Sequence, residues 1–122
     1  MAVALAGGFA GAAGALARYL LDGAVQDRTS GLFPFGTFTV NVVGSFVLGL
    51  VAGIVLRHGG SGTLEAIVGS GFCGGLTTWS TAACETVRLA AEGSVATAVR
   101  FTLANLAASL AAAAVGLLVV WG

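Results

Sequence analysis

The sequence predicts an all-α membrane protein with four transmembrane helices, the third of which is broken in the middle of the membrane. The first observation is composition, because 57% of the 122 residues are hydrophobic and only 8% are charged, whereas soluble domains carry about 25% charged residues. The second is spacing, because the charges separate apolar runs of about 20 residues, the length that a helix needs to cross a bilayer. The third is a cluster of glycines and hydroxyl side chains within the third run.

The predicted spans cover about residues 3–21, 33–56, 64–89 and 97–121, and together they form a single transmembrane domain over residues 1–122. No basic residue precedes the first apolar run, so we interpret it as a retained helix rather than a signal peptide. The second span opens at Pro34, because proline is tolerated in the first turn of a helix. The fourth ends at Trp121, a residue type that is favoured at membrane interfaces.

Positive charge predicts how these spans are oriented. The connection between the first and second spans and that between the third and fourth share one face of the membrane, and the other face has Arg57 alone. Because cytoplasmic loops carry an excess of arginine, the first face is predicted to be cytoplasmic. The net charge is zero, so no attraction to nucleic acid is expected. The arginines of the first face are Arg18, Arg28, Arg88 and Arg100.

The segment "GFCGGLTTWSTAACET", which runs from Gly71 to Thr86, predicts the break. Glycines stand at positions 69, 71, 74 and 75, and each costs a helix about 1 kcal/mol relative to alanine. A half-helix that ends near Gly74 would direct carbonyls toward a cation, and one that starts near Thr77 would direct N–H groups toward an anion. The alternative is a packing kink in which the hydroxyls bond to the backbone.

Two polar stripes accompany the predicted break. In each stripe the residues lie four positions apart. The second span has Thr37, Asn41 and Ser45, and the fourth has Phe101, Asn105 and Ser109. A buried asparagine often joins two helices, but the stripes and the hydroxyl cluster together predict a polar track across the membrane. Such a track offers hydrogen-bond donors without fixed positive charge, which suits a small, strongly hydrated anion that must also be released.

Three further side chains are candidates for function. The indole of Trp79 offers an N–H group and a partly positive ring edge to an anion. Arg18 and Glu85 lie within the predicted spans, where charged groups are functional candidates by default, and the alternative is that each extends to the membrane interface.

These residues resemble the CrcB/Fluc family of fluoride channels over essentially the whole chain. The similarity is carried by the first helix ending in "ARY", by "FGTFTVNVVGSFVLG" and above all by "GFCGGLTTWSTAACET". The resemblance implies antiparallel, dual-topology dimers of four-helix subunits in the cell membrane, in contact with lipid. It also implies two fluoride pores along the dimer interface, a structural Na⁺ ion at its centre, and passive export of cytoplasmic fluoride that protects against fluoride toxicity.

The resemblance implies roles for residues around the break. Asn41 matches the pore asparagine of the family, and Thr37 lies one turn before it. Gly74 and Thr77 match positions whose backbone carbonyls hold the sodium ion, and they are the metal-binding residues that we expect. Ser80 and Thr81 match positions where hydroxyls meet the fluoride ion.

The remaining roles concern the fourth helix and two charged residues. Asn105 and Ser109 match the polar track of the family's fourth helix, and Phe101 stands where that track often has tyrosine. Arg18 and Glu85 match a first-helix arginine and a third-helix glutamate, so we expect them to be structural charges.

The chain departs from the family pattern at two aromatic positions. The family usually reads T-T-F-S-T-F, with both phenylalanines lining the pores, whereas Trp79 stands at the first position and Ala82 at the second. Some organisms carry two paralogous subunits that form heterodimers of fixed opposite orientation. The chain is therefore expected to form either a homodimer or a heterodimer with a paralogous subunit.

Two other functions remain open from the sequence. A small multidrug-type exporter would need a membrane-embedded carboxylate, for which Glu85 is the candidate. A non-conducting partner subunit of a heterodimeric channel is the second alternative, suggested by the loss of an aromatic residue at Ala82. An enzyme is not expected, because the sequence offers no nucleophile–base pair and no metal-ligand cluster.

Overall fold

The computed structural model describes residues 1–60 and 62–122, and the described part of the chain is helical with no strand. Three helices are long and apolar enough to cross a membrane, namely α1 (Ala2–Arg28), α2 (Phe35–His58) and α6 (Val95–Trp121). Between α2 and α6 lie four shorter elements. They are α3 (Gly62–Leu64), the π-helix η1 (Glu65–Cys73), α4 (Gly74–Leu76) and α5 (Ser80–Ala91). The all-α membrane architecture predicted from composition and apolar runs is confirmed.

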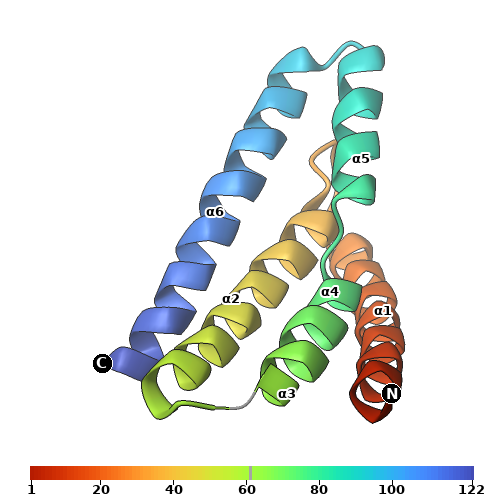
Figure 1. The fold of residues 1–122 in the computed structure, drawn as a ribbon. Coiled ribbons are helices and arrows are strands. Elements are labelled where there is room, and N and C mark those ends of the chain that lie inside the picture. Colours follow the sequence, from red (N-terminus) through yellow and green to blue (C-terminus); the bar gives the residue numbers. More distant parts are fainter. Residues whose placement is uncertain (61) are drawn as a thin grey trace.

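Figure 1 shows how these helices are arranged. The two termini, the end of α2 and the start of α3 lie at one end, and the α1–α2 and α5–α6 connections lie toward the other. Helix α2 packs along α6, α1 packs against η1 and α4, and α5 packs against the first half of α6. The elements α3, η1 and α4 follow one another as one continuous helical segment. Helix α5 continues beyond it after a short extended connection.

Close backbone contact explains why α1 and the helical η1–α4 segment are rich in glycine. A Cβ atom at Gly75 would collide with the carbonyl oxygen of Gly11, and one at Gly71 would lie 2.7 Å from the carbonyl oxygen of Gly7. Small residues let two helices approach this closely within a membrane, where packing rather than water drives helix association. Gly71 and Gly75 of this helical segment therefore allow it to pack closely against α1.

The helical coil is interrupted at Thr77–Trp79, where the backbone leaves helical geometry and Thr77 is extended. The amide of Thr78 does not continue the helical ladder, because it donates to Oδ1 of Asn41 at 2.8 Å. Helix α5 then begins with the amide of Thr81 donating to the hydroxyl oxygen of Thr78 at 3.1 Å, as a capping threonine accepts at the start of a helix. The sequence predicted a break between Gly74 and Thr77, and the interruption lies directly after that stretch.

The buried core is small and lies where α5 meets α6. Phe101 is 1% exposed and meets the ring of Phe33 edge-on, with ring centroids 5.6 Å apart and an interplanar angle of 82°. Many large apolar side chains stay outside this core, and Trp79 is the most exposed aromatic residue at 86%. So much apolar surface suits contact with lipid and with another subunit.

Candidate functional site

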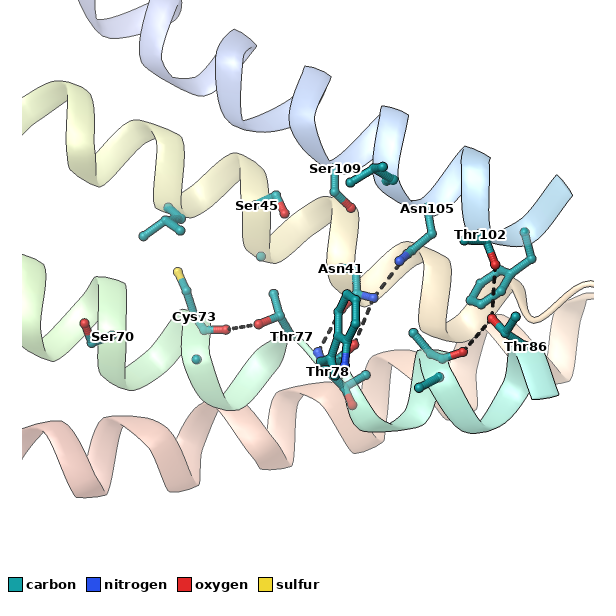
Figure 2. Close-up of a pocket in the computed structure, with 18 of the residues that line it drawn as sticks. Asn41, Ser45, Ser70, Cys73, Thr77, Thr78, Thr86, Thr102, Asn105 and Ser109 are labelled. Carbon is teal, nitrogen blue, oxygen red and sulfur yellow. Dashed lines mark hydrogen bonds between the residues drawn. The ribbon is translucent and has the colours of Figure 1, made fainter. Parts of the chain in front are cut away.

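A cavity of about 830 Å³ lies between α2, the helical η1–α4 segment, α5 and α6. Among the described residues, no charged side chain lines this cavity. Its polar side chains are mainly the amides of asparagines and the hydroxyls of serines and threonines. Figure 2 shows these polar side chains in a row along the helices, from Ser70 at one end to Thr86 and Thr102 at the other. The cavity therefore offers hydrogen-bonding groups without a fixed charge.

Asn41 lies at the middle of this row and is 7% exposed. Its Nδ2 atom donates to the carbonyl oxygen of Thr78 and to Oδ1 of Asn105, each at 3.1 Å. Its Oδ1 atom accepts from the amide of Thr78. Asn41 thus joins α2 to both the interruption and α6, which is the helix-joining alternative considered from the sequence.

These bonds leave donors free elsewhere in the cavity. Both protons of the Asn41 amide group are used, so a ligand there would find its donor in the Nδ2 group of Asn105, which donates to no other residue in the described part of the chain. The hydroxyl of Ser109 is buried and has no partner among the described residues. An unpaired buried hydroxyl is costly, so Ser109 favours a ligand that accepts its hydrogen bond, and the half-buried Asn105 offers a second donor beside it.

Two hydroxyls close the far end of the row. The hydroxyls of Thr86 and Thr102 lie 3.2 Å apart, and each also donates to the carbonyl four residues before it, at 2.9 Å. Two hydroxyl protons serve three contacts, so one contact at a time lacks a proton. Back-bonds of this kind are the arrangement that the sequence allowed for a packing kink, and the interruption has one of its own, because the hydroxyl of Thr77 donates to the Cys73 carbonyl at 2.9 Å.

The interruption also frees backbone carbonyls. In a continuous helix the Gly74 carbonyl would accept from the Thr78 amide and the Thr77 carbonyl from the Thr81 amide. Both amides are diverted, the first to Asn41 and the second to the hydroxyl of Thr78. The Thr77 carbonyl instead accepts from Nη1 of Arg18 at 3.4 Å. Gly74 and Thr77 therefore present carbonyl oxygens without their helical donors.

A second cavity of about 160 Å³ lies between α1, α2 and the start of α5. We call it the charged chamber, because Arg18 and Asp22 line it together with Thr37 and Thr81. Thr78 lines both this chamber and the larger cavity. Thr78 therefore lies at the boundary between a charged cavity and one that is uncharged among the described residues.

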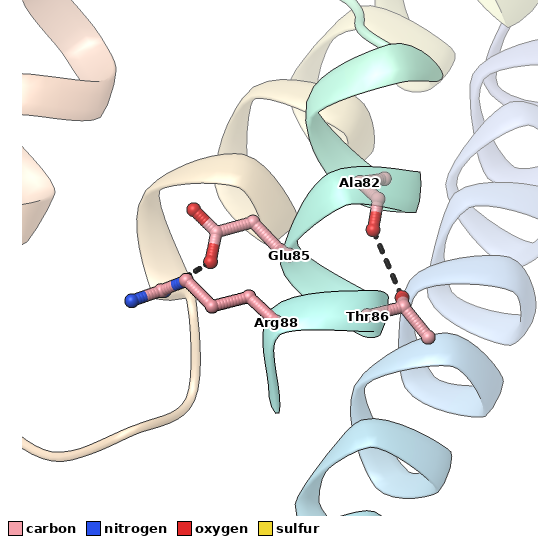
Figure 3. A network of polar contacts seen from close by, with 4 residues as sticks. All are labelled: Ala82, Glu85, Thr86 and Arg88. Carbon is pink, nitrogen blue, oxygen red and sulfur yellow. Dashed lines mark hydrogen bonds and ion pairs between the residues drawn. The ribbon is translucent and has the colours of Figure 1, made fainter. Parts of the chain in front are cut away.

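The structure divides the residues expected to form the site into three groups. The larger cavity is lined by Asn41, Gly74, Thr77, Trp79, Phe101, Asn105 and Ser109. The charged chamber is lined by Arg18, Thr37 and Thr81. Ser80 and Glu85 line neither cavity. Figure 3 shows Glu85 in an ion pair with Arg88, its neighbour one turn later on α5.

The sequence reasoning missed Asp22 and the bonds of Thr78. Asp22 lies four residues after Arg18, a spacing that places two side chains on one face of a helix, so a signal for the charged chamber was present. The pairing of Thr78 with Asn41 left no such signal, because 37 residues separate the two.

Comparisons with known proteins agree with this architecture. Residues 5–117 match the family described as CrcB-like protein, Camphor Resistance (CrcB). A relative from Leifsonia xyli, named fluoride-specific ion channel FluC 1, is 46% identical over 117 residues, which cover 96% of this chain and 82% of the relative. A relative of the same name from Frankia casuarinae is 45% identical over 91% of this chain and 92% of its own length.

A relative from Haloarcula marismortui is named fluoride-specific ion channel FluC 2, and it is 45% identical over 94% of this chain and 87% of its own length. Each of these matches spans most of both chains, and the family match begins within α1 and ends within α6. Together with three membrane-spanning candidates, they show that this chain is a multi-pass membrane protein that belongs to the CrcB family.

Proposed function

We propose that this chain is a subunit of a fluoride-selective ion channel that exports cytoplasmic fluoride passively and so protects the cell from fluoride. The names of the similar proteins support this proposal. The observation that carries it is the larger cavity, in which amide and hydroxyl donors follow one another with no charged side chain among the described residues. The protein acts as a channel and not as an enzyme.

Fluoride suits this cavity for a physical reason. It is small and strongly hydrated, so a pore must replace its water with hydrogen-bond donors and yet let the ion leave. The Nδ2 group of Asn105 and the hydroxyl of Ser109 are donors of this kind. A fixed positive charge in their place would hold the anion too tightly for rapid passage.

A structural sodium ion fits the freed carbonyls. Gly74 and Thr77 would hold it through backbone oxygens that have lost their helical donors, and the ion would supply positive charge that fixes the interruption. Gly74 is exposed and lines the larger cavity, so its carbonyl and that of a second subunit could share one ion at an interface.

The third membrane span is proposed to consist of α3, η1 and α4 followed by α5, which gives four spans with the third one broken. The subunit is proposed to pair with a second one in antiparallel orientation, and the partner would close the larger cavity, beside which Trp79 stands exposed. That partner is a second copy or a paralogue. Similar proteins carry names numbered 1 and 2, which supports the existence of paralogous subunits.

The two alternative functions fare differently. A multidrug-type exporter would need Glu85 in the path, but this carboxylate is paired with Arg88 and lines neither cavity. The exporter is therefore not favoured. The non-conducting partner is retained as one outcome of the test, because the exposed Trp79 could fill the pore of an assembled channel.

The test is fluoride release from liposomes that contain this chain alone, followed by a fluoride electrode after a potassium ionophore sets the voltage. Chloride release is the control for selectivity. Fast release of fluoride but not chloride is expected if the chain forms a homodimer. Release that needs a co-reconstituted paralogue would support the heterodimer, and no release in either preparation would refute the channel.

A further inference from the structure

A hydrogen bond between two side chains crosses the larger cavity from α2 to α6. Nδ2 of Asn41 donates to Oδ1 of Asn105 at 3.1 Å, and both residues line the cavity. Figure 2 shows this bond within the row of polar side chains, with Ser70 toward one end of the row and Thr102 toward the other. An ion that follows the row therefore meets a bond that the protein makes with itself.

The carboxamide of Asn41 is fixed in one orientation. A carboxamide has an oxygen that accepts and an NH₂ group that donates. The Thr78 amide donates to Oδ1 of Asn41 at 2.8 Å, and the Thr78 carbonyl accepts from Nδ2 at 3.1 Å. Exchange of the oxygen and the nitrogen would break both bonds. The second proton of Nδ2 is therefore held toward α6 as a fixed donor.

The carboxamide of Asn105 is held much less firmly. It is half-buried, and in the described part of the chain its side chain has one hydrogen bond, the one from Asn41. The helices that carry the two asparagines are in backbone contact further along, where a Cβ atom at Gly49 would collide with the Ala113 carbonyl. Because that contact and the bonds of Asn41 fix the surroundings, a ligand at this point is accommodated by rotation of the Asn105 side chain.

We infer that Asn105 is a specificity-determining residue, an inference that rests on the proposed fluoride channel. Its Oδ1 atom holds the position from which an anion would accept the fixed donor of Asn41. Fluoride displaces this oxygen, and the Asn105 carboxamide turns so that its own Nδ2 group also donates to the ion. Two donors from facing helices then meet one anion. No covalent bond forms or breaks, and no proton is transferred.

This competition discriminates between anions by their strength as acceptors. A hydrogen bond to an ionised acceptor is about twice as strong as one between neutral groups, so a compact anion can displace a neutral carboxamide oxygen. Chloride carries the same charge on a larger radius and gains less from the displacement. When the ion leaves, Oδ1 of Asn105 returns, so the Asn41 donor is not left unpaired. The same oxygen therefore opposes chloride entry and assists fluoride release.

The first experiment compares fluoride and chloride efflux from liposomes for the wild type, Asn105→Ala and Leu103→Ala. It uses the preparation in which the wild type conducts, alone or with a paralogue. Leu103 is exposed on the same helix and lines neither cavity. Its variant is the matched control, because it also shortens a side chain of α6 to alanine.

We expect the ratio of fluoride to chloride efflux to fall about tenfold in Asn105→Ala, which corresponds to one net hydrogen bond. Faster chloride efflux should cause the fall, because chloride no longer has to displace an oxygen. Leu103→Ala should keep the wild-type ratio. An unchanged ratio in Asn105→Ala would overturn the inference. A ratio that falls only because fluoride slows would also overturn it, since Asn105 would then act as a donor without competing.

A second measurement uses the wild-type protein and does not require conduction. Asn41 and Asn105 are the two asparagines of the sequence, so isotopic labelling of asparagine gives two side-chain NH₂ groups in an NMR spectrum of the protein in detergent. Asn105→Gln keeps a carboxamide without the label and assigns the two signals. Fluoride should shift the NH₂ signals of both residues, because each exchanges a partner, and chloride at the same concentration should leave them in place.

The outcomes separate this inference from the proposed channel. NH₂ signals that both anions shift alike, or that neither shifts in a protein with fluoride-selective flux, refute the exchange at Asn105 and leave the channel standing. Wild-type protein that releases no fluoride, alone or with a paralogue, refutes the channel and this inference with it.

Discussion

The segment from Gly74 to Thr81 has two faces with different surroundings. One face, with Gly74 and Thr77, meets the larger cavity, which is uncharged among the described residues. The other face has Gly75 against the backbone of α1 and Thr81 beside Arg18 and Asp22. The difference shows that one short stretch performs two tasks, because its open face offers polar groups to a ligand while its closed face fixes the segment against α1.

The largest expected effect comes from placing a charge on the open face. Asn41→Asp should slow fluoride efflux by about 100-fold or more, because the carboxylate repels the anion and loses both donations to Thr78 and Asn105, at about 1–3 kcal/mol for each buried group left unpaired. Efflux from liposomes measures the effect. Gln26→Glu makes the same chemical change at an exposed position of α1 and should leave efflux unchanged. Equal rates for the wild type and Asn41→Asp would show that the open face is not the path.

Substitution of two neighbouring glycines tests the difference between the two faces directly. Gly75→Ala should lower the free energy of unfolding by about 2 kcal/mol, because the added methyl group meets the Gly11 carbonyl and overpacking typically costs about 1–3 kcal/mol. Gly74→Ala adds the same methyl group where no atom lies within 4 Å, so it should not destabilise the protein. Thermal unfolding in detergent gives both values. Similar losses for the two variants would remove the distinction between the faces.

Sodium should stabilise the open face. Replacing sodium with a large organic cation should lower the free energy of unfolding by about 1.4 kcal/mol when sodium had been present at about ten times its dissociation constant. The measurement is the unfolding temperature at constant ionic strength, with potassium as the control cation. A protein that is equally stable in all three solutions would have no sodium site at Gly74 and Thr77.

The smallest expected effect concerns two serines that the family resemblance places on the fluoride path. Ser109→Ala removes a buried hydroxyl from the larger cavity and should slow fluoride efflux about fivefold, which corresponds to about 1 kcal/mol for a lost hydrogen bond. Ser80→Ala changes a hydroxyl that lines neither cavity and should conduct as the wild type does. A reversed order would place the ion path outside the larger cavity.

Composition and apolar periodicity were sufficient to predict the all-α membrane fold, because the bilayer sets both the length and the chemistry of its helices. The glycines of "GFCGGLTT" correctly drew attention to this region, but their cause was only partly predictable. Gly71 and Gly75 serve contact with α1, and the interruption follows from the bonds of Asn41 to Thr78. A contact between residues 37 positions apart has no local pattern in the sequence.

The candidate site shows the same limit. Thr37, Asn41 and Ser45 form one stripe in the sequence, yet Thr37 lines the charged chamber while the other two line the larger cavity. The stripe predicted which side chains share a face of α2. It could not predict that Thr78 would lie at the boundary of both cavities in front of that face, because the position of Thr78 depends on its bonds to Asn41.

The bonds of Thr78 bear on how fast an ion could pass between the two compartments. Its amide and carbonyl are held by Asn41, so only the Thr78 side chain is free to rotate. That rotation breaks the hydrogen bond from the Thr81 amide, which as a helix cap is worth about 1 kcal/mol. Side-chain rotations take picoseconds to nanoseconds, whereas helices and domains rearrange in microseconds to milliseconds. A barrier of this kind suits the continuous flow of a channel and not the slow alternating cycle of a carrier.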